Sequence, residues 1–305
     1  MVCDMINKVF SSAAEAVADI PDGASLAVGG FGLVGIPAVL IDAILEQGAS
    51  DLKTVSNNCG LDGFGLGKLL EAHRISRTIA SYVGSNKEFA RQYLSGELSV
   101  ELTPQGTLAE RMRAGGAGIP AFYTPAGVGT QVAEGGLPIR YDGDGGIAEA
   151  SVPKETREFG GELFVLEEAI RTDYALVHAY KGDRLGNLCF RGTARNFNPD
   201  CAGAGRITIA QVEHLVELNA EVVETALDTV DKLLDAESGR DRVADQIVRE
   251  TLLTVSSDWP FMVSKDTAAE YAVRRAHTHA HATRERADAA LRGRTEQATR
   301  LTANW

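Results

Sequence analysis

The chain has little of several features that mark particular classes of protein. Only 6% of its 305 residues are aromatic, and its four cysteines form no CxxC or CxxH pair. That spacing predicts neither a zinc site nor a disulfide framework, and no metal is expected. No apolar run approaches the roughly 18 residues of a membrane span. The N-terminus MVCDMINKVF lacks the apolar core of a signal peptide, so we expect a cytoplasmic protein.

Positive charge is also scarce. The sequence has 30 Lys and Arg against 42 Asp and Glu, which gives a formal net charge of −12. A surface that binds nucleic acid or an anionic membrane needs a basic face, so neither partner is expected. With 44% hydrophobic and 24% charged residues, the composition is typical of a soluble globular protein with a sizeable core.

Glycine, by contrast, is concentrated at one point. Residues 22–37 read DGASLAVGGFGLVGIP, in which the apolar run Leu26–Val28 is followed within seven positions by Gly29, Gly30, Gly32 and Gly35. A plain turn between a strand and a helix needs fewer glycines. The cluster therefore indicates unusual φ angles or a close approach of a ligand to the backbone. In open α/β sheets, ligands bind at the carboxyl ends of strands.

The chain divides into two regions that meet near residue 217. All but two of its 32 glycines precede residue 218. In the first region short β-rich runs alternate with amphipathic segments, which predicts an α/β fold. The strand candidates are 25–28, 52–56, 75–81, 100–102, 174–179 and 207–212. Residues 218–305 predict helices, because their apolar residues recur at helical spacing.

Proline, glycine and turn-forming residues predict two further features of the first region. Pro37 and Gly48 flank an amphipathic segment, which predicts a helix over 37–47. The YDGDGG sequence predicts a hairpin-like insertion between Arg140 and Leu166. In the second region HTHAH is interpreted as a solvated helix face, because its three imidazoles cannot converge on one metal ion.

Polar residues follow two of the predicted strands. Asn57 and Asn58 end the run 52–56, and Gln105 follows the run 100–102 within a second cluster of proline and glycine. The amides of Asn57 and Asn58, at a strand's carboxyl end, can donate to a developing oxyanion, whereas the alternative is an ordinary strand-ending turn. Cys59 is a candidate nucleophile, but a small buried thiol is the commoner role. The two loops form either two walls of one crevice or two unrelated loops.

Several sequence blocks carry a resemblance to known families. They read, in order, DGASLAVGGFGLVGIP, VSNNCGLDGFGLG, SYVGSNKEFARQYLSGELSVELTPQGTLAERMRAGGAGIPAFYTP, VPKETREF and ARNFNP. Over about residues 7–217 the chain resembles class I coenzyme A transferases, and among them the A subunits of succinyl-CoA:3-oxoacid CoA-transferases. Residues 218–305 are instead similar to the C-terminal helical region of glycoside hydrolase family 57 α-glucan branching enzymes, whose catalytic barrel has no counterpart here.

The resemblance implies a fold and an activity. Residues 1–217 are expected to form an α/β domain with a central mixed sheet flanked by helices, and 218–305 an all-α region without chemistry of its own. The implied activity moves CoA from succinyl-CoA to a 3-oxo acid such as acetoacetate. A partner B subunit would supply a nucleophilic glutamate within a Glu-Asn-Gly motif, which this chain lacks, so a heterotetramer is expected. The alternatives are another acid, such as 3-oxoadipate or acetate, or a non-catalytic fusion or scaffold protein.

The resemblance also implies site residues. No residue of this chain is expected to act as nucleophile, and Asn57, Asn58 and Gln105 are expected to make polar contacts to the acyl group or its oxyanion. The CoA thioester, a substrate rather than a permanently bound cofactor, would lie along a loop with free N–H groups. The residues of this loop are Gly29, Gly30, Phe31, Gly32, Leu33, Val34, Gly35 and Ile36. A side chain at Gly30 or Gly32 would then occupy ligand space, so Gly30→Val should reduce activity more than stability.

Overall fold

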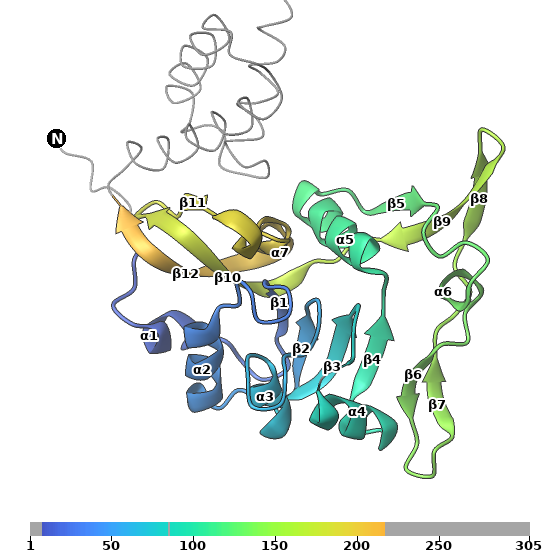
Figure 1. Cartoon of the computed structure of the whole chain (residues 1–305), viewed down its shortest axis with the longest axis horizontal. Helices are drawn as coiled ribbons and strands as arrows, with labels where there is room; N and C mark the ends of the chain where they lie inside the picture. The colour runs from blue at the N-terminus through green and yellow to red at the C-terminus, as the bar shows by residue number, and fades with distance from the viewer. Residues whose placement is uncertain (1–7, 85, 217–305) are drawn as a thin grey trace, which may run out of the picture. The chain divides into compact units, whose positions relative to one another are not determined.

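Parallel strands dominate the architecture of residues 8–84 and 86–216, which the computed structural model describes (Figure 1). They form a mixed seven-stranded sheet in the order β11-β10-β1-β2-β3-β4, with β12 also paired to β10. Only the β10–β11 pair among these strands is antiparallel. The strands are β1 (Ser25–Val28), β2 (Leu52–Val55), β3 (Ile75–Ala80), β4 (Ser99–Leu102), β10 (Thr172–Asp183), β11 (Leu188–Cys189) and β12 (Gly205–Val216).

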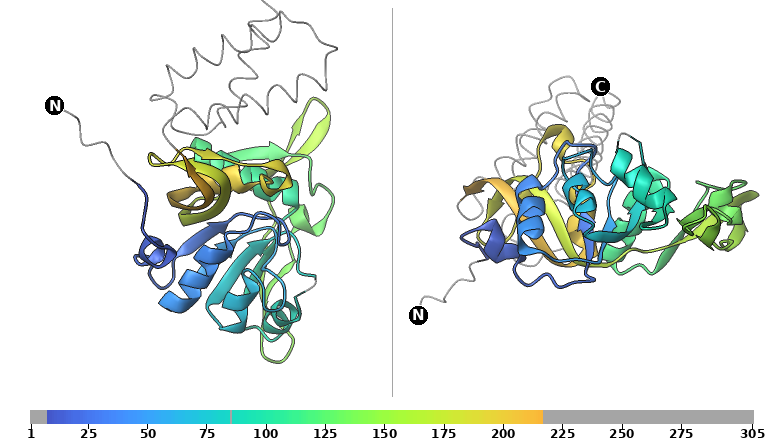
Figure 2. Two further views of the ribbon diagram at one scale, coloured as in Figure 1. Left: turned by 60° about the vertical axis from the view of Figure 1, so that its left-hand side comes forward. Right: turned by 90° about the horizontal axis from the view of Figure 1, so that it is seen from below.

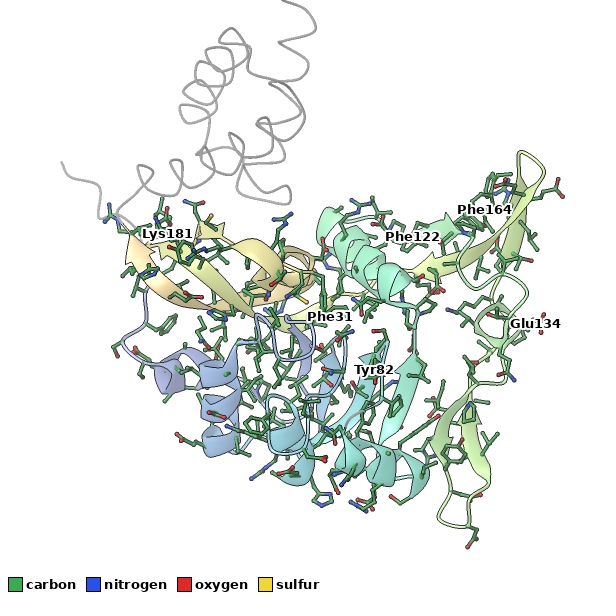
Figure 3. All side chains as sticks on the ribbon, in the orientation of Figure 1. Phe31, Tyr82, Phe122, Glu134, Phe164 and Lys181 are labelled. Atoms are coloured by element: carbon green, nitrogen blue, oxygen red, sulfur yellow. The ribbon has the colours of Figure 1, made fainter. Side chains whose placement is uncertain are left out.

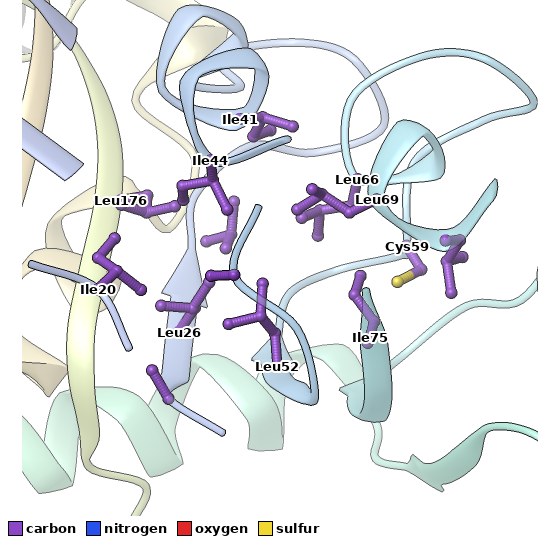
Figure 4. Packing of buried hydrophobic residues seen from close by; sticks show 14 of the residues in the cluster. Ile20, Leu26, Ile41, Ile44, Leu52, Cys59, Leu66, Leu69, Ile75 and Leu176 are labelled. Atoms are coloured by element: carbon purple, nitrogen blue, oxygen red, sulfur yellow. The ribbon is translucent and has the colours of Figure 1, made fainter. Parts of the chain in front are cut away.

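Helices cover both faces of this sheet, which confirms the predicted fold class. One face packs against α1 (Ala13–Val17), α2 (Ala38–Gln47), α3 (Gly67–Glu71) and α4 (Lys87–Leu94), and the other against α5 (Gln105–Ala117) and α7 (Asn198–Ala204). Successive strand side chains alternate between faces, so Leu26 and Val28 join the first core while Ala27 joins the second. Figure 4 shows Leu26 and Leu52 packed with Ile44 in the first core.

The predicted strands and helix are confirmed, with small differences in their bounds. Helix α2 begins one residue later than predicted, because Pro37 is its N-cap. It ends at Gly48, whose φ of +94° lets the N–H bond the Ile44 carbonyl at 3.0 Å. Strands β10 and β12 are longer than their apolar runs, because their parallel ladder extends through polar positions to Asp183 and Val216.

The predicted insertion contains two hairpins rather than one. Strands β6 (Pro138–Tyr141) and β7 (Ile147–Ala150) enclose the YDGDGG turn. Strands β8 (Thr156–Phe159) and β9 (Glu162–Glu168) form the second hairpin, and β9 also pairs with β5 (Ala121–Thr124). The turn between β8 and β9 is Gly160-Gly161, with φ values of +62° and +86°. Figures 1 and 2 show both hairpins, with α6 (Gln131–Glu134) between them, beyond β4.

The described residues end before the predicted C-terminal helical region. Residues 8–84 and 86–216 belong to a unit that ends at Val216. The helical region predicted over 218–305, with HTHAH, lies outside the described residues, and the boundary at residue 217 stays a prediction. No helix in the described ranges is long and apolar enough to cross a membrane.

Candidate functional site

Four loops meet at the carboxyl edge of the central strands. The loops follow β1, β2, β3 and β4, which are adjacent and parallel, so their carboxyl ends lie at one edge. Figure 3 shows Phe31 and Tyr82 at this edge, and both side chains are about half exposed at 50% and 53%. Residues from the first three loops share hydrogen bonds here with Gln105, the first residue of the helix that follows β4, so Asn57 and Gln105 do line one site.

Two of these loops share one local structure. In the first glycine loop, residues 29–36, Phe31 and Val34 exchange backbone hydrogen bonds of 2.9 and 3.0 Å. In the second glycine loop, residues 59–67, Leu61 and Phe64 exchange bonds of 3.1 and 2.9 Å. Glycines with positive φ bracket both turns: Gly30 and Gly35 in the first, Gly60 and Gly65 in the second. The turns project large exposed apolar side chains, namely Phe31, Leu33, Val34 and Phe64.

Packing within the chain explains the first two glycines of the first loop. A Cβ at Gly29 would lie 2.6 Å from Cγ of Asn198, and one at Gly30 would lie 3.0 Å from Cα of Ile36. Gly30 also has a φ of +110°, which an L-residue rarely adopts. A side chain at Gly30 would meet its own loop, so we expect a substitution there to lower stability rather than to fill ligand space. At Gly32, with a φ of +59°, a Cβ would meet nothing within 4 Å.

The amides of the first glycine loop are only partly available. Gly29 N–H donates to the Leu176 carbonyl at 3.0 Å, and Gly32 N–H donates to Oδ1 of Asn57 at 3.2 Å. Phe31 and Val34 use their N–H groups within the turn. The expected free N–H groups are therefore found in only part of the loop. Among the described residues, four N–H groups of this loop have no partner: those of Gly30, Leu33, Gly35 and Ile36.

Side-chain amides form a compact network beside this loop. The Nδ2 group of Asn57, a residue 4% exposed, donates to Oγ of Ser81 and to Oε1 of Gln105, each at 3.0 Å. The Ser81 hydroxyl donates to the same Gln105 oxygen at 2.5 Å. Pro104 is the N-cap of α5, so Gln105 is the first residue of that helix. Sequence reasoning missed Ser81, and the only signal was a hydroxyl at the last position of the predicted strand 75–81.

Asn58 borders a small pocket at the same edge. Its side chain is largely buried, and its Oδ1 accepts from the Gly60 N–H at 3.3 Å. The pocket is also lined by Gly29, Gly32 and Ser56. The Ser56 hydroxyl is occupied, because it donates to the Val28 carbonyl at 2.8 Å. No described group accepts a hydrogen bond from the Asn58 Nδ2 group, so this group is a candidate donor to a ligand.

Two asparagines of the ARNFNP segment support the first glycine loop from far along the chain. Nδ2 of Asn198 donates to the carbonyls of Gly35 at 3.0 Å and Ala194 at 2.9 Å, and Oδ1 accepts from the His178 N–H at 3.2 Å. Nδ2 of Asn196 donates to the Val34 carbonyl at 3.2 Å. The sequence placed these asparagines in a matching block but assigned them no role.

Cys59 does not have the environment of a nucleophile. Its side chain is fully buried, and burial raises the pKa of the thiol to about 12, so the thiolate does not form near neutral pH. The buried structural role is therefore the one the structure supports. Within residues 8–84 and 86–216, no three His, Cys, Asp or Glu side chains gather as metal ligands.

A cavity of about 470 Å³ lies elsewhere, between β4, α5 and the hairpins. Its buried carboxylate, Glu167, accepts from Nζ of Lys154 at 2.6 Å. Arg111 at the same cavity pairs with Glu101 at 2.7 Å. These charges satisfy one another, unlike the loop N–H groups at the strand edge, which have no partner among the described residues.

Comparison with known proteins places the chain in a family. The coenzyme A transferase model matches residues 10–228. The A subunit of a probable succinyl-CoA:3-ketoacid coenzyme A transferase from Mycobacterium bovis is 71% identical, over 70% of this chain and 86% of the relative. The A subunit of the Xanthomonas campestris enzyme is 51% identical, over 80% and 95% of the two chains. The chain therefore belongs to the coenzyme A transferase family, as a subunit of the A type.

A solved structure and a second family model complete the comparison. The acyl-CoA transferase of Escherichia coli O157:H7, solved as a thioester complex with CoA, is 25% identical with a TM-score of 0.56. The match covers 68% of this chain and 43% of the other. A model described as 1,4-alpha-glucan branching enzyme, C-terminal, matches residues 218–304 and so overlaps the end of the first match.

Proposed function

We propose that this chain, joined to a B subunit in a heterotetramer, moves CoA from succinyl-CoA to a 3-oxo acid such as acetoacetate. The single observation that carries the proposal is the arrangement of amides at the strand edge beside two glycine loops. The names of the similar A subunits supply the acyl donor and the class of acceptor. The family membership supplies the transferred group.

The chemistry of the site supports acyl transfer. Attack on a thioester carbonyl places negative charge on the carbonyl oxygen, and neutral donors held in position stabilise that charge. The outward Nε2 of Gln105 and Nδ2 of Asn58 are such donors, and both lie next to the first glycine loop. That loop, residues 29–36, would take the CoA thioester and pantetheine arm, with Gly32 offering open space for the approach.

The nucleophile is proposed to come from the B subunit. The groups that share hydrogen bonds with Asn57, Asn58 and Gln105 are amides, hydroxyls and backbone groups, and none is a carboxylate. The carboxylate of β4, Glu101, is paired with Arg111 at 2.7 Å. The partner's glutamate would attack the acyl-CoA carbonyl and expel the CoA thiolate, which gives a mixed acyl-glutamyl anhydride. The thiolate would then attack the glutamyl carbonyl and release the acyl group as its free carboxylate, which leaves a glutamyl-CoA thioester, and the acceptor acid would take CoA from it by the reverse steps.

The same partner would cover the apolar tips of the two glycine loops. The exposed fractions of Phe31 and Phe64 are 50% and 60%, although both stand beside the polar site. Exposed apolar groups gathered beside a site are typical of a protein interface. We further propose that residues 218–305 form a separate region of the branching-enzyme type that contributes no residue to this chemistry.

The test is reconstitution with a matching B subunit, followed by an assay of CoA transfer over a panel of acids. We expect the purified chain alone to be inactive and the mixture to transfer CoA from succinyl-CoA, with acetoacetate preferred over acetate and 3-oxoadipate. Gln105→Glu should remove most of the activity. Gln47→Glu serves as the control, because the Gln47 amide on α2 bonds the Ile20 carbonyl and the Ala49 N–H, away from the site. Turnover by the chain alone, with a glutamyl-CoA adduct on one of its own residues, would overturn the role assigned to the partner.

A further inference from the structure

One chain of hydrogen bonds runs from the first glycine loop to the start of α5. It passes from the Gly32 N–H to Oδ1 of Asn57 at 3.2 Å, and from Nδ2 of Asn57 to Oε1 of Gln105 at 3.0 Å. Ser81 closes it laterally, because its Oγ accepts from Nδ2 of Asn57 at 3.0 Å. Its hydroxyl hydrogen faces two acceptors, Oε1 of Gln105 at 2.5 Å and the Asn57 backbone carbonyl at 3.0 Å, and the Gln105 oxygen is the nearer. The four residues come from the loops after β1, β2 and β3 and from the first position of α5.

This chain of bonds permits one orientation of the Asn57 amide. A backbone N–H can only donate, so the group facing Gly32 must be the Asn57 oxygen. The Nδ2 group then faces Ser81 and Gln105, and its two hydrogens match the two acceptors found there. Both Nδ2 hydrogens of this 4% exposed amide are thus used inside the protein, and its oxygen accepts from the Gly32 N–H.

The orientation of Gln105 follows from that of Asn57. The donating Nδ2 of Asn57 requires an acceptor, so the Gln105 oxygen faces inward and takes bonds from both Asn57 and Ser81. The Gln105 Nε2 group is left on the opposite side, and no described residue accepts from it. Rotating the amide would set N–H donors of Gln105 and Asn57 against each other, which is costly in a partly buried network.

We propose that Ser81 and Asn57 are positioning residues whose joint action holds the Nε2 donor of Gln105 outward, toward the substrate oxygen. Gln105 alone of the three contacts the substrate. This inference deepens the proposed CoA transfer and rests on it. It also changes the role of Asn57, because both its Nδ2 hydrogens are bonded inside the protein and none is left to donate to an acyl oxygen.

The first test reads the orientation without any activity. In the full-length chain with isotope-labelled side-chain amides, NMR should show fast hydrogen exchange for Gln105 and slow exchange for Asn57. Asn57→Asp keeps the acceptor for Gly32 but replaces the Nδ2 donor by a second acceptor. We expect Gln105 then to turn its Nε2 inward, so its exchange becomes slower than in the wild type. Unchanged or faster exchange of Gln105 in Asn57→Asp would overturn the proposal.

The second test reads catalysis in the enzyme reconstituted with its B subunit. Ser81→Ala should lower kcat about fivefold to tenfold, the worth of one hydrogen bond, with the KM for succinyl-CoA unchanged. Ser81→Thr, which keeps the hydroxyl, should restore kcat. In a Gln105→Glu background, where the outward donor is gone, Ser81→Ala should change kcat less than about twofold.

Ser25→Ala is the matched control. The Ser25 hydroxyl also bonds a distant side chain, Asp173, at 2.7 Å, but Ser25 opens β1 at the opposite end of that strand. We expect no change in kcat from it in either background. If Ser81→Ala and Gln105→Glu lowered kcat independently, so that their effects multiplied in the double variant, the positioning role of Ser81 would be refuted while the proposed function stayed intact. A wild-type complex without CoA transfer would refute the proposed function, and the exchange experiment would still decide the orientation.

Discussion

Two neighbouring glycines of the first glycine loop should respond in opposite ways to the same substitution. Gly30 has a φ of +110°, and a Cβ there would lie 3.0 Å from Cα of Ile36. Gly32 has a φ of +59° and open space around its missing Cβ. Alanine at either position adds one methyl group, so any difference between the variants reports on the surroundings rather than on the size of the change.

The magnitudes follow from these two environments. At Gly30, alanine should cost about 1–3 kcal/mol for its backbone conformation and about 1–3 kcal/mol for the forced contact with Ile36. At Gly32 the left-handed conformation alone should cost about 1–2 kcal/mol. Because domains are stable by only about 5–15 kcal/mol, Gly30→Ala should remove a large fraction of the total.

The assays are urea unfolding followed by circular dichroism and CoA-transfer kinetics with the B subunit, both on the full-length chain. We expect Gly30→Ala to lower the free energy of unfolding more than Gly32→Ala does, with activity per folded molecule retained. Gly32→Ala should show the reverse, because its methyl group points into the space assigned to the thioester. Equal losses of stability, or loss of activity confined to Gly30→Ala, would refute the reasoning.

Three other outcomes are expected. Burial raises the pKa of the Cys59 thiol from its ordinary value of 9.0 to about 12, so the unfolded chain loses this proton first and the free energy of unfolding falls as pH rises from 9 to 12. Urea melts across this pH range should show a shallower fall for Cys59→Ala than for the wild type, and equal slopes would contradict the assignment. Lys154→Met leaves the carboxylate of Glu167 buried without its nearest cation and should cost about 3 kcal/mol in the same melts, whereas adding Glu167→Gln should restore most of that loss. Deleting residues 218–305 should leave the α/β unit folded by circular dichroism, and failure of that fragment to fold would move the predicted boundary at residue 217.

Local patterns allowed much of the fold to be predicted. The strand 25–28 was predicted with its final bounds because an apolar run ends abruptly in glycines, and the helix 37–47 because Pro37 and Gly48 act within one turn. The number of hairpins was not predicted correctly. The Gly160-Gly161 turn supplies a second reversal that depends on pairing β9 with β5, which lies more than forty positions earlier in the chain, as in the pair Thr124 and Val165.

The candidate site was predicted in part. Asn57 and Asn58 stood out because their amides end a predicted strand, whereas Gln105 was chosen by the family resemblance. The structure does bring Asn57 and Gln105 into contact. Ser81 was missed, since a serine after a strand is too common to indicate a role. The asparagine that holds Gly35, Asn198, lies 163 positions away, and no short pattern connects the two.

The sequence by itself determined where strands end, where glycine replaces side chains and which polar types stand at those ends, because these features depend on neighbours within a few residues. Only the tertiary structure decided which N–H groups of the first glycine loop are already bonded, why Gly30 is glycine and which way the Gln105 amide points. Each of those outcomes depends on a hydrogen-bond partner or a packing contact supplied across a loop or from another strand. Directional bonds between distant segments exist only after the chain has folded, so the donors left for a substrate can be counted only there.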